Sequence, residues 1–157
     1  MLKIRFIVVD RTRSSFLKEG EAFYLKRLQR YAPVEWVEVR STKIKKDRQG
    51  EEILKKEGLA IARRLKPKDY LIALDRSGRQ YDSEELAAWL KRLSINIRGW
   101  LCFIIGGPVG LSREILDRAD ERLSLSSLTL THEMSRLFLV EQVYRSFTII
   151  KGQKYHK

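Results

Sequence analysis

Two short apolar runs constrain the fold of this chain more than any other feature of its sequence. The runs are "YLIALD" (70–75) and "WLCFII" (100–105). Runs that are apolar almost throughout, rather than alternating, are typical of strands buried on both faces of a parallel sheet. Helical patterns precede and follow each of them. The alternation predicts an α/β fold, with a mostly parallel sheet covered by helices on both faces.

The other elements follow from the same periodicities. We expect strands over 3–10 and 34–40, a mobile polar loop over 41–50, and a turn at Ser77-Gly78. The expected helices run from Ser14 or Ser15 to about Tyr31, from about Glu51 to Leu65, from a Ser83 cap to about Leu93, over 111–119, and onward from a Thr131 cap. No repeat or linker divides the 157 residues, so the sequence predicts a single domain over 1–157.

The net charge of the chain narrows the class of molecule that it is expected to bind. Lys and Arg number 32 against 20 Asp and Glu, a formal net charge of +12, which favours nucleic acid or an anionic membrane. No apolar run approaches the roughly 20 residues of a spanning helix, and the first strand reaches Asp10 too early for a signal peptide. We therefore expect a cytoplasmic protein that does not bind membranes. The basic stretches at 43–48, 63–68 and lysines 151, 154 and 157 could track phosphates or be ordinary solvated surface.

Metal chemistry is not indicated by the sequence. The single Cys102 and the two histidines, His132 and His156, fall short of a zinc site. Cys102 is most simply a buried thiol in an apolar strand. We expect no bound metal.

A glycine-rich turn, "IGGPVG" (105–110), follows the second apolar run. Ligands of parallel sheets bind beyond the carboxyl ends of the strands, which places this turn and "ALD" (73–75) at one edge of the sheet. The turn matches neither the phosphate-binding P-loop nor the dinucleotide fingerprint. A phosphate could still sit on the helix that follows Gly110. A tight turn that serves only packing is the alternative.

An uncharged segment, 123–131, alternates leucines with small hydroxyl residues. It could bury its leucines while its backbone and hydroxyl groups bind an uncharged heterocycle, or it could be an ordinary strand. The helix that follows carries a wide apolar face. That face predicts burial between layers or against a second subunit.

Four motifs occur in order along the chain: "LIALD", "FIIGGPVGLS", "LSLSSLTLTHEMSRLFLVEQVYRSF" and the ending "KYHK". With them the sequence resembles the small SPOUT methyltransferases of the ribosomal RNA large subunit methyltransferase H family, over essentially its whole length. The resemblance implies a C-terminal trefoil knot in the α/β fold and a homodimer. It also implies transfer of a methyl group from S-adenosylmethionine to N3 of a pseudouridine in the helix 69 loop of 23S rRNA, in the assembled ribosome.

The resemblance further implies that backbone groups of the knot loops hold the cofactor. By position in the motifs, the cofactor-binding residues are Leu74, Gly106, Leu125, Ser126, Ser127, Leu128, Thr129 and Leu130. A lysine in the glycine turn would repel the sulfonium, so its absence agrees with this ligand.

The resemblance implies that the tail of one subunit completes the active site of the other. Tyr155 would stack on or hydrogen-bond a nucleobase, and His156 would contact phosphate or assist removal of the N3 proton. A frayed basic tail is the alternative. Relatives often have proline where this chain has Lys154, which leaves the path of the tail less constrained, and also where it has Thr131, which alters the entry to the loop but supplies a helix cap.

Arg136 is the third candidate catalytic residue that the resemblance implies. It would bind the cofactor carboxylate or an RNA phosphate, or it would form a surface ion pair with Glu133 or Glu141. His132 lies four residues earlier on the same helix face and could instead serve only the helix start.

Two other functions fit the same chain. It could be an RNA-binding protein without catalysis, or a methyltransferase of tRNA. The intact glycine turn and Tyr-His tail argue against the first, and the motif order argues against the second.

Overall fold

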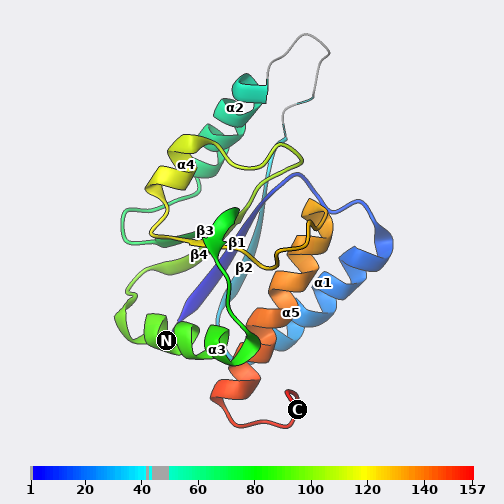
Figure 1. Cartoon of the computed structure of the whole chain (residues 1–157), viewed down its shortest axis with the longest axis vertical. Helices are drawn as coiled ribbons and strands as arrows, with labels where there is room; N and C mark the ends of the chain where they lie inside the picture. The colour runs from blue at the N-terminus through cyan, green and yellow to red at the C-terminus, as the bar shows by residue number, and fades with distance from the viewer. Residues whose placement is uncertain (1, 42, 44–49) are drawn as a thin grey trace.

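The computed structural model describes residues 2–41, 43 and 50–157 (Figure 1). Five strands form one parallel sheet in the order β2-β1-β4-β3-β5. The strands are β1 (Lys3–Val9), β2 (Val34–Val39), β3 (Tyr70–Arg79), β4 (Trp100–Ile105) and β5 (Glu121–Leu123). The predicted α/β fold with a parallel sheet is confirmed, and the two apolar runs form β3 and β4, which lie inside the sheet because both of their faces are apolar.

Helices cover both faces of this sheet (Figure 1). α1 (Ser15–Leu28), α3 (Ser83–Asn96) and α5 (His132–Ile150) pack on one face, and α2 (Gly50–Ala62) and α4 (Arg113–Arg118) pack on the other. Alternate residues of β1 show the division, since Ile4, Phe6 and Val8 join the first core while Ile7 and Val9 join the second. Of the helices in the described ranges, none is long and apolar enough to cross a membrane.

β3 continues to Arg79, through the Ser77-Gly78 pair at which the sequence predicts a turn. The turn prediction is wrong because β5 pairs with this extension, where Leu123 lies opposite Arg79 after a register shift. Gly78 permits the pairing, since a Cβ there would lie 2.6 Å from main-chain atoms of Arg122 and Leu123. The close crossing of β3 and the chain at β5 is consistent with the knot that the resemblance implies.

The start of α3 differs from the prediction by one residue. Asp82, not Ser83, is the N-cap: its Oδ1 accepts a hydrogen bond from Glu85 N at 2.7 Å, while the Glu85 carboxylate accepts one from Asp82 N at 2.9 Å. This reciprocal capping box satisfies two free amides at once, which a serine cap alone does not. The Ser83 hydroxyl instead donates to Gln142 Oε1 at 2.8 Å and ties α3 to α5.

Other boundaries shift where the sequence carries little periodicity. α1 and α2 end a few residues before the predicted limits, α3 runs three residues further, and β5 is too short to give a pattern. The predicted cap of α5 is confirmed, because Thr131 Oγ1 accepts from Met134 N at 3.1 Å. Most of the predicted mobile loop over 41–50 and of the basic stretch 43–48 lies outside the described residues.

The predicted buried thiol is confirmed in β4. Cys102 has no exposed surface, and its Sγ lies 3.8 Å from Arg5 Nη1. Burial raises the pKa of the Cys102 thiol to about 12, so it stays protonated and unreactive at neutral pH. Arg5 pairs with Glu35 at 2.7 Å and with Asp69 at 3.0 Å, which joins the amino ends of the strands.

Candidate active site

A cavity of about 600 Å³ opens beyond the carboxyl end of β4 and beside the middle of β3. Its wall consists of residues 74–76, 105–111, 123–126, 128–132 and 135. This is the edge of the sheet where the sequence predicts ligand binding, and the volume is in the range of small-molecule sites. The three segments come from β3, from the turn after β4, and from the stretch between β5 and α5.

The glycine turn is closed on itself and forms one wall. Gly110 N donates to Gly107 O at 3.0 Å, and Gly110 has φ +81°, a left-handed conformation that favours glycine. A Cβ on Gly106 would collide with the main chain of Gly110. Ser112 caps α4 by accepting from Ile115 N at 3.3 Å, which satisfies one of the free amides at the start of that helix. The glycine turn is therefore both tightly packed and part of the cavity wall.

The uncharged segment after β5 is not a strand. Regular pairing ends at Leu123, so the strand interpretation of 123–131 is wrong beyond that residue. Local hydrogen bonds replace the ladder: Ser124 Oγ donates to Ser126 O at 3.2 Å, and Ser126 Oγ accepts from Leu128 N at 3.0 Å. The segment thereby turns along the cavity and leads into α5.

The structure gathers the residues that the resemblance assigns to the cofactor. Seven of the eight line the cavity: Leu74, Gly106, Leu125, Ser126, Leu128, Thr129 and Leu130. Ser127 lies between two of them in the chain but does not itself line the cavity. Residues 50 positions apart in the sequence thus share one wall, as binding of a common ligand requires.

Three titratable residues line the cavity. The pKa of the Asp75 carboxyl is lowered, chiefly because the Ser77 hydroxyl donates to its Oδ2, which also accepts from Ser77 N at 3.0 Å. Arg76 is exposed to solvent. Burial lowers the pKa of His132, and the nearby Arg136 cation adds to the effect, so the imidazole is neutral at pH 7. His132 is both the first residue of α5 and part of the wall.

Arg136 is a residue of the second turn of α5, and it has no exposed surface. Its Nη2 donates to Val9 O at 2.5 Å, and its Nη1 donates to Thr12 Oγ1 at 3.0 Å. The Thr12 hydroxyl in turn donates to Glu21 Oε1 at 2.6 Å. Burial lowers the pKa of the Arg136 guanidinium, and the Glu21 carboxylate opposes that shift. In this position Arg136 joins α5 to β1 and α1 and does not line the cavity.

The surface ion pair that was the alternative for Arg136 is wrong. Glu133 accepts from the main-chain nitrogen of Arg13 at 2.6 Å, and Glu141 pairs with Arg145 at 2.6 Å. A contact of Arg136 with the cofactor carboxylate or with RNA stays a prediction, and it requires the guanidinium to exchange its present hydrogen bonds.

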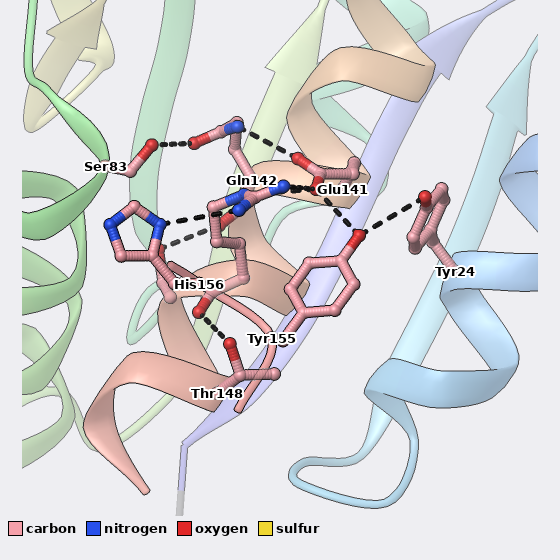
Figure 2. Close-up of polar contacts among 9 residues, drawn as sticks. Tyr24, Ser83, Glu141, Gln142, Thr148, Tyr155 and His156 are labelled. Atoms are coloured by element: carbon pink, nitrogen blue, oxygen red, sulfur yellow. Dashed lines mark hydrogen bonds and ion pairs between the residues drawn. The ribbon is translucent and has the colours of Figure 1, made fainter. Parts of the chain in front are cut away.

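The tail packs on α5 rather than fraying (Figure 2). The Tyr155 hydroxyl donates to Glu141 Oε1 at 3.0 Å and lies 3.4 Å from the Tyr24 hydroxyl oxygen. The Tyr155 ring packs edge-on against Tyr144, and the Arg145 guanidinium lies 4.7 Å from its centroid. Burial raises the pKa of Tyr155, helped by its hydrogen bonds to Tyr24 and Glu141, so the phenol stays protonated.

His156 joins the same cluster from its other side (Figure 2). Its Nδ1 lies 3.4 Å from Arg145 Nη1, and its Nε2 lies 3.7 Å from the Glu84 carboxylate on α3. The frayed-tail alternative is therefore wrong for Tyr155 and His156. We call the group Glu141, Arg145, Tyr155 and His156 the tail cluster.

The tail cluster and the cavity are separate within one chain. Neither Tyr155 nor His156 lines the cavity, and Glu141 follows His132 by nine residues on α5, about 13 Å along the helix axis. Figure 1 shows the start of α5 near the carboxyl ends of the strands and the C-terminus at the opposite end of that helix. The predicted cofactor residues lie together at the cavity, and the predicted tail residues lie together in the tail cluster. Within one chain these two groups are apart.

Comparison with known proteins decides the family. A family described as "Predicted SPOUT methyltransferase" matches residues 2–156. The chain belongs to the SPOUT methyltransferase family. Curated relatives of this SPOUT methyltransferase include a protein of Carboxydothermus hydrogenoformans, 41% identical over 159 residues that cover 99% of this chain and 100% of the relative. Another, from Syntrophotalea carbinolica, is 44% identical and covers 99% of each chain. Both are named ribosomal RNA large subunit methyltransferase H, which confirms the resemblance.

Solved structures agree on the fold. A probable methylase family protein from Haemophilus influenzae superposes with a TM-score of 0.59 at 16% identity, covering 100% of this chain and 72% of that one. A probable methyltransferase from Bordetella pertussis gives a TM-score of 0.58 at 14% identity, covering 92% and 96%. At these identities the likeness supports the fold of the SPOUT methyltransferase alone.

Sequence reasoning missed several residues of this SPOUT methyltransferase site. Arg76 lines the cavity, and Glu141, Arg145 and Tyr24 hold the tail. The four-residue spacing of Glu141 and Arg145 was a visible signal for an ion pair on one helix face. The roles of the others depend on which segments the fold brings together.

Proposed function

We propose that this chain, as one SPOUT domain over residues 1–157, is a cytoplasmic methyltransferase of 23S rRNA. It transfers a methyl group from S-adenosylmethionine to N3 of a pseudouridine in the helix 69 loop of the assembled ribosome. The curated relatives, named for the large ribosomal subunit RNA, support this substrate class. The observation that carries the proposal is the cavity whose wall contains seven of the eight expected cofactor residues.

The cavity fits a bent, partly cationic cofactor. Its glycine turn admits a ligand close to the backbone, and the segment 124–130 presents hydroxyls, amides and leucines to a heterocycle. Among the described residues, those that line it include the acid Asp75 and no lysine. When bound, S-adenosylmethionine supplies a methyl group on a sulfonium, which needs no activation by a metal.

The chain's own residues must align the target and accept a proton. A bond forms between N3 and the methyl carbon as the carbon–sulfur bond breaks, and N3 loses its proton. Tyr155 keeps its own proton, so it offers a stacking surface rather than a base, and it donates to a nucleobase only after giving up its hydrogen bond to Glu141. His156 would contact an RNA phosphate or accept the N3 proton, and its ring lies 3.4 Å from Arg145 Nη1 and 3.7 Å from the Glu84 carboxylate. Alignment of N3 with the methyl carbon supplies most of the remaining rate enhancement.

The active site is composite in this proposal, formed by two copies of the chain. The separation of the tail cluster from the cavity within one chain supports it, because Tyr155 and His156 cannot serve their own cavity from where they pack. Exposed apolar side chains also support a homodimer. Leu128 beside the cavity is 75% exposed, and Phe16 and Phe23 on α1 are 68% and 50% exposed.

Arginines near the cavity favour RNA as the substrate. Arg76 lines the cavity, and Arg79 lies exposed on the β3 extension with its guanidinium 4.8 Å from the centroid of the Tyr81 ring. Arg122 lies on the adjacent β5. The basic stretch 63–68 precedes β3 and therefore lies at the opposite end of the strands from the cavity. The phosphate contacts nearest the target are thus assigned to the β3–β5 edge.

Methyl transfer from labelled S-adenosylmethionine tests the proposal directly. Ribosomes that lack the modification, free 23S rRNA and bulk tRNA are offered in parallel, and the labelled nucleoside is identified by mass spectrometry. N3-methylpseudouridine formed in ribosomes supports the proposal. Label in tRNA would replace the substrate, and RNA binding without any label would favour a non-catalytic protein.

Heterodimers test the composite site. A variant damaged in the cavity, Gly106→Val, is mixed with one damaged in the tail, Tyr155→Ala and His156→Ala together. We expect partial recovery of methyl transfer, because one of the two sites in each heterodimer is intact. No recovery after verified subunit exchange would contradict a composite site.

A further inference from the structure

Asp75 is the one acid among the residues that line the cavity, within the described ranges. It directly follows Leu74, a residue expected to contact the cofactor, at the point where β3 passes the cavity. The side chain is half-buried, so its charge is only partly screened by water. Two hydrogen bonds from Ser77 to its Oδ2 hold the carboxylate in place and keep it ionised at neutral pH.

Two cations act on this carboxylate, Arg122 on β5 and Arg76, and neither of them is buried. Arg76 lines the cavity but is exposed, so solvent and salt screen it. His132 is neutral at pH 7 because its pKa is lowered. Arg136 is buried and does not line the cavity, and its guanidinium donates to Val9 O and Thr12 Oγ1. A cationic ligand in the cavity therefore gains attraction from Asp75.

We propose that Asp75 is a charge-selecting residue, whose carboxylate favours the cationic methyl donor over the uncharged product of transfer. The inference rests on the proposed function. When the methyl group leaves, the electron pair of the carbon–sulfur bond stays on sulfur, and the sulfonium becomes a neutral thioether. The attraction to Asp75 is lost at that moment, so the cavity binds the spent cofactor more weakly than the methyl donor.

Binding affinities of three ligands test this selection. S-adenosylmethionine carries a cationic sulfur, sinefungin carries a protonated amine at nearly the same place, and S-adenosylhomocysteine carries neither. We expect Asp75→Asn to weaken binding of the two cationic ligands on the order of tenfold, and binding of S-adenosylhomocysteine by less than about twofold. Titration calorimetry measures all three without catalysis. Asparagine keeps an acceptor for Ser77, so the local turn is retained.

Two further variants separate charge from shape. Arg76→Gln removes the opposite charge and should shift the preference toward the cationic ligands. Glu114→Gln removes one negative charge from an exposed residue of α4 that does not line the cavity, and should leave all three affinities unchanged. Higher salt should shrink the preference of the unaltered protein.

The outcomes distinguish the two proposals. If the unaltered protein binds none of the three ligands, the proposed cofactor function fails. If it binds them and Asp75→Asn weakens all three equally or none, the charge selection by Asp75 is wrong while the proposed function stands.

Discussion

The Tyr155 hydroxyl donates to Glu141 Oε1 at 3.0 Å, and that same carboxylate oxygen accepts from Arg145 Nη2 at 2.6 Å. One oxygen of α5 thus holds both the tail and the arginine that lies over the tail's aromatic ring. Hydrogen bonds to a charged carboxylate oxygen are stronger than hydrogen bonds to a neutral acceptor. Glu141 is therefore the residue on which the position of the tail most depends.

Replacing Glu141 should release the tail. We expect Glu141→Ala to increase the rate of trypsin cleavage after Lys154 severalfold, because Tyr155 and Arg145 both lose their acceptor. Tyr155→Phe is the matched control, since it loses the hydroxyl contacts with Glu141 and Tyr24 but keeps the ring contacts with Tyr144 and Arg145. Equal cleavage rates in both variants would show that Glu141 does not hold the tail.

Arg136 should be important to folding. Arg136→Ala removes a fully buried cation and leaves Val9 O and the Thr12–Glu21 pair without their donor, at a cost of about 3–5 kcal/mol in the free energy of unfolding. Urea denaturation measures it. Arg113→Ala, a highly exposed arginine on α4, should change the same free energy by no more than about 0.5 kcal/mol. A loss of activity with unchanged stability in Arg136→Ala would instead favour a direct catalytic role.

Glu57 should make stability depend on pH. It is 4% exposed, its Oε2 has no hydrogen-bond partner among the described residues, and burial raises the pKa of its carboxyl above 4.5, with Asp10 adding to the shift. The folded state therefore holds this proton more tightly than the unfolded state, and the stability from Glu57 is lost as pH rises from 4.5 through the raised pKa. Glu57→Gln should be more stable than the unaltered protein by about 1–2 kcal/mol at pH 8 and lose that advantage near pH 4.5.

Urea titrations at several pH values follow that difference. Glu114→Gln, on the exposed surface of α4, is the control and should show no pH-dependent gain. A constant difference between Glu57→Gln and the unaltered protein at every pH would mean that the carboxyl does not titrate as its burial requires.

The crossing of β3 and β5 should tolerate no side chain at Gly78. A Cβ there would lie 2.6 Å from the main chain of Arg122 and Leu123, so we expect Gly78→Ala to destabilise the fold by about 1–3 kcal/mol. Gly50→Ala is the matched control, since nothing lies within 4 Å of its Cβ position at the start of α2. Thermal unfolding of the two variants compares them. A Gly78→Ala protein as stable as Gly50→Ala would contradict the close crossing.

Patterns that repeat over several residues were sufficient to predict most elements. The two apolar runs gave β3 and β4, because a strand buried on both faces must be apolar throughout. The cap of α5 at Thr131 was also predictable, since capping depends on residues three apart. The predictions failed at Ser77-Gly78 and at Ser83, where a distant strand or an adjacent acid outcompetes the local preference.

The candidate site divides in the same way. Its residues were identified through motifs, yet neither motif nor spacing predicted that Arg136 is buried, that Arg76 lines the cavity, or that Glu141 holds Tyr155.

The sequence alone determined the class of fold, the edge of the sheet where the ligand site lies, the family, and the basic character that favours RNA. These are properties of local patterns and of charge, which do not depend on how distant segments meet. Only the tertiary structure decided which side chains share the cavity and that the tail cluster is assembled away from it. Contacts such as Tyr155 with Glu141, or Gly78 with β5, join segments far apart along the chain, and packing of the whole molecule sets their geometry.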